Sequence, residues 1–439
     1  MNWVSATGCG KKTNKKQEEI SSCFCIFNPV FAKVVIRLWV KCAAGEKCAV
    51  CVHSVYSGYL FFGGSEMEVL YQNLFNIELG HVAMWAIGGL LIYLAIAKKM
   101  EPTLLLPMGF GAILVNLPLM EAGTGVQHVL DTLFSIGIEG AELFPLMLFI
   151  GIGAMIDFTP LLTNPKLMIF GAAAQFGIFF TLALASLFGF ELKDAASIAI
   201  IGAADGPTSI FVATELGSGY LGAIMVAAYS YMALVPLVQP PIIKLCTTKA
   251  ERKIKMQYKG KPVSKLTKIL FPIVVTMIVA FVAPDAVALI GFLMFGNLIR
   301  ECGVLNSLSE TAQNVLANLI TIFLGISIAS QMRAEDFLQW DTLIIIGLGL
   351  VAFIFDTFGG IMVAKIMNLF SKEKINPMIG AAGISAFPMS ARVVHKLGLE
   401  EDNQNFLLMH SIGVNVSGQI ASVIAGGLIL ALVKAAIGG

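Results

Sequence analysis

One acidic residue lies within an otherwise apolar stretch of the chain, in the run Gly202-Ala-Ala-Asp205-Gly206-Pro207-Thr208. A carboxylate in the middle of a membrane-length apolar segment costs roughly 2.5–3.5 kcal/mol on insertion scales unless it is solvated or paired. The neighbouring glycines and proline unwind a helix and free backbone carbonyls beside the acid. One charged oxygen with several neutral oxygens suits a hard monovalent cation. The alternative role of Asp205 is to cap a helix that begins at Pro207.

Neutral oxygen donors occur in two other apolar segments. Asn415 and Ser417 lie in the middle of the last one, and Asn376, Ser385 and Ser390 lie in a segment interrupted by glycine and proline. Each of them alone is explained equally well by a hydrogen bond between close-packed helices. Taken together with the buried acid, they favour an ion site.

Three further positions carry groups that can exchange protons or bind anions. Tyr229 and Tyr231 lie in mid-segment, away from the membrane interfaces where tyrosines usually gather, so one of them is a candidate proton donor. Arg392 has the planar fork that binds a carboxylate, and its alternative partners are Asp205 or the cytoplasmic interface. Asp356 interrupts another apolar segment and is a candidate for a secondary ion site.

The composition of the chain indicates the class of protein to which these residues belong. The chain has 439 residues, of which 57% are apolar and 13% charged, with a net charge of +1. Soluble domains carry about 25% charged residues. A water-soluble enzyme, a nucleic-acid binder and a disordered chain are therefore excluded, and we expect an all-α polytopic membrane protein.

Apolar segments of membrane-spanning length follow one another from about residue 80. They cover residues 80–97, 103–120, 142–157, 164–190, 195–214, 219–245, 266–283, 285–300, 313–332, 341–369, 375–396 and 404–436. Glycine, proline and charge interrupt 195–214 and 375–396, so these two are expected to be broken and re-entrant. The chain would then have about ten full transmembrane helices and two re-entrant segments.

The charges of the loops support that topology. Residues 244–268 contain nine Lys/Arg and one acid, which predicts a cytoplasmic position. The loop 121–141 contains acids but no Lys or Arg and fits the outside. The basic stretch reaches the cytoplasm only if 195–214 enters the membrane and returns on the same side.

The two halves of the chain resemble each other. Residues 149–157 are similar to 323–331, and the run at 202–210 is similar to that at 380–388. Each half would hold five full crossings and one re-entrant segment, and an odd number of crossings makes the repeats inverted. Inverted repeats with paired broken helices point to a transporter with its site at the repeat interface. We therefore expect repeats at 67–245 and 266–439, joined by a basic cytoplasmic linker at 246–265.

Residues 1–66 differ from the rest of the chain. They hold eight Lys/Arg, four acids and six of the eight cysteines, and no clean signal-peptide pattern. Cys48 and Cys51 form a single CxxC pair, which without a second pair is a weak zinc signal. We expect a poorly assignable extension, with the membrane protein proper beginning near Met67.

Four dense motifs resemble the β subunits of sodium-translocating biotin-dependent decarboxylases, which serve oxaloacetate, methylmalonyl-CoA, glutaconyl-CoA or malonate decarboxylase complexes. The motifs are GAADGPTSIFVATELG (202–217), GAIMVAAYSYMALVPLVQPPI (222–242), KINPMIGAAGISAFPMSARVVHKLG (374–398) and NFLLMHSIGVNVSGQIASVIAGG (405–427). The similarity extends from about residue 70 to the C-terminus and does not include residues 1–66.

The resemblance implies a mechanism and a complex. Such a subunit decarboxylates carboxybiotin on a separate carrier subunit, consumes an external proton and exports Na+, in an elevator-like manner. Its partners would be a carboxyltransferase α subunit, the biotin carrier, a small single-span γ subunit and, in some complexes, a δ subunit. It would be a multi-pass protein of the bacterial inner membrane and a homo-oligomer of β.

The resemblance also implies roles for individual residues. Tyr231 would help to deliver the proton, and Arg392, with Ser385, would hold the carboxybiotin beside Asp205. The Na+ ligands would be Asp205, Asn376, Ser385, Asn415 and Ser417.

Two other functional classes remain as alternatives. A Na+-coupled secondary organic-anion transporter would share the repeats and would move solute without biotin or decarboxylation. A non-catalytic membrane scaffold is disfavoured, because a scaffold does not require Asp205 and Arg392 in broken segments. No Met-Lys-Met biotin attachment sequence is present, so the carrier is expected on another chain.

Overall fold

The computed structural model describes residues 76–118, 125–140, 142–257, 262–371 and 373–438, and these residues form helices and loops without a strand. Residues 1–66, with the expected extension and the Met67 start, lie outside the described residues. By their contacts, residues Ile77–Gly439 form a single compact unit.

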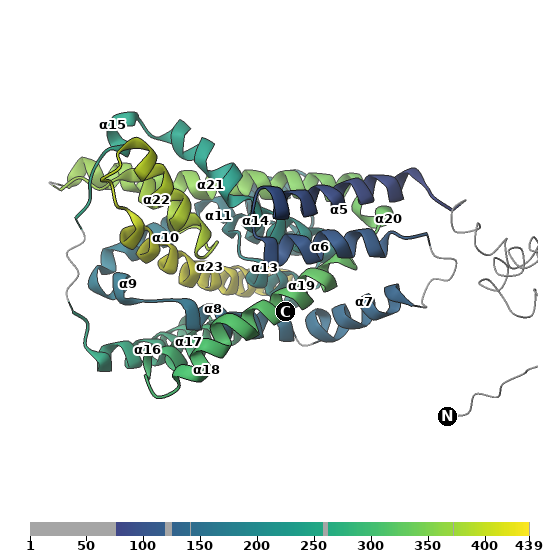
Figure 1. Ribbon diagram of the computed structural model, residues 1–439, viewed down its shortest axis with the longest axis horizontal. Coiled ribbons are helices and arrows are strands. Elements are labelled where there is room, and N and C mark those ends of the chain that lie inside the picture. Colours follow the sequence, from purple (N-terminus) through teal and green to yellow (C-terminus); the bar gives the residue numbers. More distant parts are fainter. Residues whose placement is uncertain (1–75, 119–124, 141, 258–261, 372, 439) are drawn as a thin grey trace, which may run out of the picture. The chain divides into compact units, whose positions relative to one another are not determined.

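The elements up to the basic stretch are, in chain order, α5 (Leu79–Ala97), α6 (Pro102–Val115), α7 (Val126–Phe134), η1 (Ser135–Glu139), α8 (Leu143–Met155), α9 (Thr159–Thr163), η2 (Pro165–Leu167), α10 (Met168–Ala174), α11 (Phe176–Leu187), α12 (Leu192–Ala199), η3 (Ile200–Ala203), α13 (Gly206–Glu215), α14 (Leu221–Cys246) and α15 (Lys249–Arg252). Most of them lie nearly parallel to one another (Figure 1).

The elements after the basic stretch are α16 (Lys265–Val282), η4 (Pro284–Ala286), α17 (Val287–Glu301), α18 (Asn306–Glu310), η5 (Thr311–Leu316), α19 (Ala317–Ala329), α20 (Ala334–Phe337), α21 (Trp340–Phe370), η6 (Pro377–Gly383), α22 (Met389–Glu401) and α23 (Leu408–Ile437).

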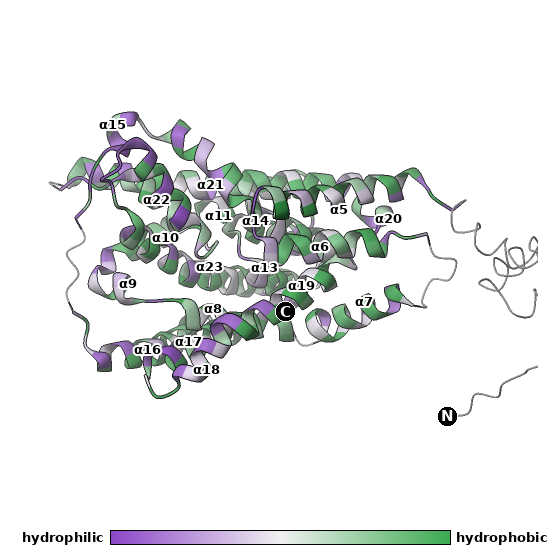
Figure 2. Cartoon of the chain, viewed as in Figure 1, coloured by the Kyte–Doolittle hydropathy of each residue, from purple (hydrophilic) through white to green (hydrophobic). Residues whose placement is uncertain are grey.

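Seven of the described helices are long and apolar enough to cross a membrane, or eight if the bent pair Val126–Glu139 and Leu143–Met155 forms one span. Helix α6, with 14 residues, is apolar but shorter. The long helices are apolar along most of their length in Figure 2. The chain is therefore an all-helical, multi-pass membrane protein, while the ten crossings and the inverted repeats remain predictions.

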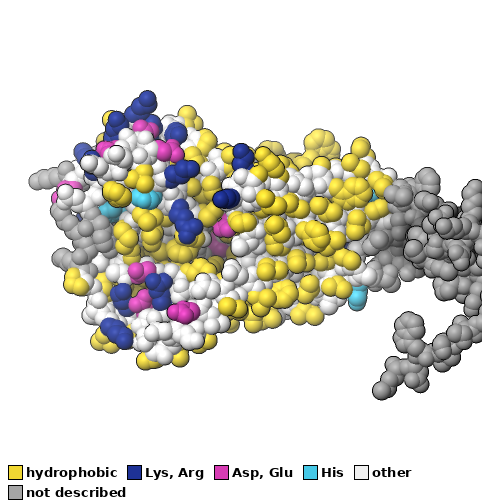
Figure 3. All heavy atoms as spheres, in the orientation of Figure 1, with side chains coloured by type: hydrophobic (Ala, Val, Ile, Leu, Met, Phe, Trp, Pro, Cys, Tyr) yellow, Lys and Arg dark blue, Asp and Glu magenta, His cyan; other side chains and the backbone are white. Residues whose placement is uncertain are grey.

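The exterior of the molecule separates apolar from charged side chains. On the face shown in Figure 3, apolar side chains cover the region of α5, α6 and α19, and charged side chains gather around α15, α22 and α16. An apolar girdle with charges towards one end is what a lipid environment favours, because charged groups are costly in hydrocarbon.

Two large buried clusters of apolar side chains form the core. One joins α8–α13 with α16, α17 and α21–α23, and the other joins α5, α6 and α19 with parts of α7, α8 and α14. Helix α14 contributes to both, and η6 packs against α21, α23 and α10. The two interrupted segments of the sequence thus lie inside protein, where irregular backbone in a membrane is tolerated.

Candidate functional site

The first interrupted segment is broken at Ala204 and Asp205. The chain leaves the 3₁₀-turn η3 at Ala204, whose φ of 51° lies in the left-handed region, and Asp205 is extended. Helix α13 then begins at Gly206, with Pro207 in its first turn, where the missing N–H costs nothing. This change of direction takes the backbone out of helical geometry beside a carboxylate.

The carboxylate of Asp205 is buried, with 3% of the residue exposed. Its Oδ2 accepts hydrogen bonds from Thr208 Oγ1 at 2.7 Å, Gln419 Nε2 at 2.9 Å and Ser422 Oγ at 3.0 Å. Within the described residues no Lys, Arg or His forms an ion pair with it. A buried carboxylate with neutral donors alone still needs a positive counter-charge, which a bound cation or a proton can supply.

The ring of Tyr229, from α14, covers the same turn. A Cβ at Gly206 would lie under 3.0 Å from the Tyr229 ring, so glycine is the residue that allows this approach. The hydroxyl of Tyr229 is buried and has no hydrogen-bond partner among the described residues. Tyr231 instead donates its hydroxyl proton to the carbonyl of Ile346 in α21. Of the two tyrosines, Tyr229 is the one that contacts the turn at Asp205.

The second interrupted segment enters as the 3₁₀-turn η6, is extended at Ile384 and continues as α22 after the cis Phe387–Pro388 peptide. Four glycines, in two facing pairs, set its packing. A Cβ at Gly380 would lie under 3.0 Å from the Gly360 carbonyl oxygen, and one at Gly418 would lie equally close to the Gly383 carbonyl. Backbone therefore packs directly on backbone where η6 meets α21 and α23, which holds its carbonyls at fixed positions.

The two broken segments meet at Ser385. Its backbone N–H donates to the carbonyl of Ala203 in the first segment at 2.9 Å, and its Oγ donates to the carbonyl of Gly418 in α23 at 3.0 Å. The amide of Asn415 donates to the Ala382 and Ile384 carbonyls at 3.1 and 2.7 Å.

The oxygen of that amide remains available. Asn415 Oδ1 is buried without a hydrogen-bond partner among the described residues. Ser417 Oγ, two residues further along α23, donates to the carbonyls of Leu167 and Val414. Ser385 and Asn415 thus meet where the second broken segment contacts α23, and the Ser385–Ala203 hydrogen bond connects that contact to the turn of Asp205. The hydroxyl of Ser417 is turned instead towards Leu167 and the helix α10.

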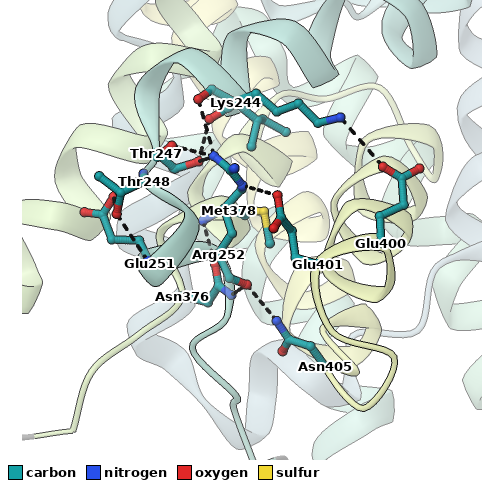
Figure 4. A network of polar contacts seen from close by, with 11 residues as sticks. Lys244, Thr247, Thr248, Glu251, Arg252, Asn376, Met378, Glu400, Glu401 and Asn405 are labelled. Atoms are coloured by element: carbon teal, nitrogen blue, oxygen red, sulfur yellow. Dashed lines mark hydrogen bonds and ion pairs between the residues drawn. The ribbon is translucent and has the colours of Figure 1, made fainter.

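Asn376 lies in different surroundings. Its amide donates to the carbonyls of Arg252 and Ile254, both at 2.9 Å, and its Oδ1 accepts from the N–H of Met378 (Figure 4). The contacts of Asn376 therefore join the start of the second broken segment to the basic stretch rather than to Asp205.

Arg392 is exposed on α22 and forms no ion pair within the described residues. The nearby charge of opposite sign is Glu101, in the turn between α5 and α6. Burial raises the pKa of the Glu101 carboxyl, and the guanidinium of Arg392 partly opposes that rise. Arg392 is thus free to bind an anion from solvent.

Asp356 is fully buried in α21. Its Oδ1 accepts the N–H of Ile178 at 3.2 Å in the first turn of α11, and its Oδ2 has no hydrogen-bond partner among the described residues. A Cβ at Gly202 would lie under 3.0 Å from Oδ2, so this acid contacts the first broken segment on another side from Asp205. As a secondary ion site it remains a prediction.

Four polar residues of this region were not selected from the sequence: Thr208, Gln239, Gln419 and Ser422. Gln239, buried in α14, donates to the carbonyl of Ala381 and to Ser390 Oγ, each at 2.7 Å. Spacing carried a usable signal for two of the others. Gln419 and Ser422 follow Asn415 by four and seven residues, which places all three on one face of a helix.

Comparison with known proteins agrees with this architecture. Residues 80–433 match the family model described as the Na+-transporting oxaloacetate decarboxylase beta subunit. The chain is 47% identical over 421 residues to the oxaloacetate decarboxylase beta chain of Haemophilus ducreyi, covering 82% of this chain and 96% of that protein. It is 47% identical over 382 residues to the methylmalonyl-CoA decarboxylase subunit beta of Propionigenium modestum, with the same coverage.

A third relative is the methylmalonyl-CoA decarboxylase subunit beta of Veillonella parvula, at 49% identity over 391 residues, 89% of this chain and 99% of that protein. The range of the family-model match, residues 80–433, includes both broken segments. The chain belongs to the family of beta subunits of Na+-transporting decarboxylases.

Proposed function

We propose that this chain is the membrane subunit in which decarboxylation of carboxybiotin drives the export of Na+. The bond between the ureido nitrogen and the carboxyl carbon breaks, CO2 leaves, and the nitrogen takes up a proton that originates outside the cell. The names of the relatives give two substrates, the acid oxaloacetate and the thioester methylmalonyl-CoA. We assign the choice of the acid or acyl-CoA to a different subunit.

The observation that carries the proposal is the buried carboxylate of Asp205, which has no cationic partner among the described residues. The Ser385–Ala203 hydrogen bond links its turn to the second broken segment, and Asn415, which donates to that segment, has a buried oxygen without a partner among the described residues. A cation would supply the missing counter-charge and the missing partner together. Ser417 adds a neutral oxygen on the same helix. We assign Asp205, Ser385, Asn415 and Ser417 to a Na+ site, and Asn376 to a ligand position nearer the basic stretch.

The proton and the carboxyl group require other side chains. Arg392, exposed and without an ion pair, is suited to the carboxylate of carboxybiotin, with Ser385 as a second contact. Tyr231 is assigned to proton delivery together with Asp205. Because Tyr229 contacts the turn at Asp205, its substitution should be tested beside that of Tyr231 for a role in proton delivery.

The surroundings of the site follow from the same proposal. Inverted repeats at 67–245 and 266–439, ten crossings and two re-entrant segments would allow an elevator-like movement of the site across the bacterial inner membrane. A carboxyltransferase α subunit, a biotin carrier, a γ subunit and in some complexes a δ subunit complete the assembly, in which β is a homo-oligomer. The basic stretch at 246–265 would face the cytoplasm, where the carrier arrives.

The test is transport by the complete decarboxylase complex in proteoliposomes. With Asp205→Asn we expect Na+ uptake to be abolished, because the neutral amide cannot balance the charge of the ion. Asp285→Asn, which changes a half-buried acid beside Lys434, is the matched control and should transport normally. Normal uptake by Asp205→Asn would refute the Na+ site.

Avidin separates this proposal from a secondary organic-anion transporter. Because avidin sequesters biotin, it should block both decarboxylation and Na+ uptake by the unmodified complex. Solute-driven Na+ uptake that continues in avidin would instead favour the transporter.

A further inference from the structure

Arg252 is buried although it lies in the most basic stretch of the chain. Only 6% of the residue is exposed, whereas its neighbours Lys249, Lys253 and Lys255 are all exposed. A charged side chain is rarely buried unless it is paired. The position of Arg252 therefore differs from that of a residue that only makes a loop basic.

The side chain of Arg252 joins the ends of two helices. Its Nε pairs with Glu401 Oε1 at 2.6 Å, and its Nη1 donates to the carbonyl of Thr247 at 2.6 Å (Figure 4). Glu401 is the last residue of α22, which continues the second broken segment, and Thr247 immediately follows α14. The guanidinium fork thus fixes the helix α15 against the end of α22.

The backbone of Arg252 reaches the candidate ion ligand. Its carbonyl accepts the amides of Asn376 at 2.9 Å and Asn405 at 2.8 Å, and the second amide hydrogen of Asn376 goes to the carbonyl of Ile254. Both N–H groups of Asn376 are therefore held by carbonyls of the basic stretch. A carbonyl can only accept, so the amide nitrogen must face this stretch and Oδ1 must point away from it.

The oxygen of Asn376 then has one lone pair to spare. Oδ1 accepts a single hydrogen bond, from the N–H of Met378, and an amide oxygen has two lone pairs. A cavity of about 590 Å³ lies in the same region, and its walls include Ile375 and Ile379 of the second broken segment and Lys255 and Met256 of the basic stretch. The docked basic stretch thus both orients Asn376 and lines part of this cavity.

We propose that Arg252 is a positioning residue for Na+ binding: by pairing with Glu401 it docks the carbonyls that orient Asn376. This inference rests on the proposed Na+ role of Asn376. Without the ion pair, the basic stretch keeps only the Asn405 hydrogen bond and the more exposed Lys255–Asp402 pair at this end of α22, so the carbonyls that orient the amide of Asn376 are held less firmly. Lysine can replace arginine only in part here: its ammonium group can pair with Glu401 but lacks the rigid fork that contacts Glu401 and Thr247 together.

The test compares the Na+ dependence of decarboxylation by the complete complex carrying Arg252→Gln, Arg252→Lys or Glu401→Gln. We expect the half-saturating Na+ concentration to rise about tenfold in Arg252→Gln and Glu401→Gln and less in Arg252→Lys, with the maximal rate largely kept. Lys244→Gln removes the more exposed ion pair with Glu400 between the same two helix ends and should leave the Na+ dependence unchanged.

A double substitution isolates the coupling to Asn376. If Arg252 acts through this amide, Arg252→Gln should add little to the effect of Asn376→Ala, so that the two changes are strongly non-additive. Additive effects would overturn the inference. A fall in yield and maximal rate at an unchanged half-saturating Na+ concentration would also overturn it, because that is the signature of a structural role alone.

The same variants distinguish the inference from the proposal on which it rests. If Asn376→Ala alters the Na+ dependence and Arg252→Gln does not, Asn376 remains a proposed ligand and the positioning role of Arg252 is refuted. An unaltered Na+ dependence in Asn376→Ala removes both assignments, while the test on Asp205 stands by itself.

Discussion

Three neutral donors converge on one oxygen of Asp205, and they come from two helices. Thr208 belongs to the helix that Asp205 itself begins, whereas Gln419 and Ser422 belong to α23. Hydrogen bonds to a charged group contribute about 1.5–3 kcal/mol each, roughly twice the contribution of neutral pairs. The donors from α23 should therefore fix the position of the carboxylate, so that a bound cation meets an oxygen that is already oriented.

Replacing one of these donors should weaken Na+ binding without removing it. We expect Gln419→Leu to raise the half-saturating Na+ concentration by at least about tenfold, the factor that corresponds to about 1.4 kcal/mol. Gln339→Leu changes an exposed glutamine next to α21 and is the control. Isothermal calorimetry with NaCl on the purified complex gives the affinity, and an unchanged value for Gln419→Leu would contradict this role.

At the scale of elements, the position of η6 depends on backbone contacts at glycine. Gly360 of α21 and Gly380 of η6 approach so closely that neither position has room for a Cβ atom. Small residues that allow helices to approach are a common device in membrane proteins, where no hydrophobic effect drives helices together. Here they hold the irregular segment that carries the proposed ligands.

Two glycines of the same helix allow a controlled comparison. Gly360→Ala should destabilise the protein by about 1–3 kcal/mol, because the new methyl group collides with the carbonyl of Gly380. Gly347→Ala meets no atom within 4 Å and should be neutral or stabilising by up to about 1 kcal/mol, from helix propensity. Thermal unfolding in detergent measures both, and equal midpoints would contradict the packing argument.

The sequence predicts the broken elements better than it predicts their partners. Glycine, proline and an acid within apolar runs are local signals, so both breaks and the role of Asp205 as a buried acid follow from nearby residues. Tyr229 and Tyr231 could not be ranked, because α14 is apolar on all sides and offers no periodicity to say which face is turned inward. The docking of Asn376 on Arg252 joins residues 124 positions apart, which no local pattern reveals.

For the whole molecule, the distribution of charge predicts the orientation in the membrane. The basic stretch at 244–268 and the acidic loop at 121–141 have opposite charge balance, and the rule for cytoplasmic loops places the basic one inside. Chemical labelling can test both regions, because each contains exposed residues that the structure describes.

A membrane-impermeant maleimide should label the two regions from opposite sides. In a chain with its cysteines replaced by serine, Lys249→Cys should react only after intact cells are opened, whereas His128→Cys should react in intact cells once the outer membrane is permeable. Both positions are exposed in the structure. Labelling of both from the same side would contradict the predicted topology and the re-entry of 195–214.

The ion pair of Arg252 also has a consequence for the order in which the chain is made. Its partners Glu401 and Asn405 follow it by 149 and 153 residues, so they are still unsynthesised when α15 leaves the ribosome. Until then the arginine stays in water, and the end of α14 lacks its partner. The end of α14 and the helix α15 therefore cannot complete their final contacts until the second half of the chain has been made.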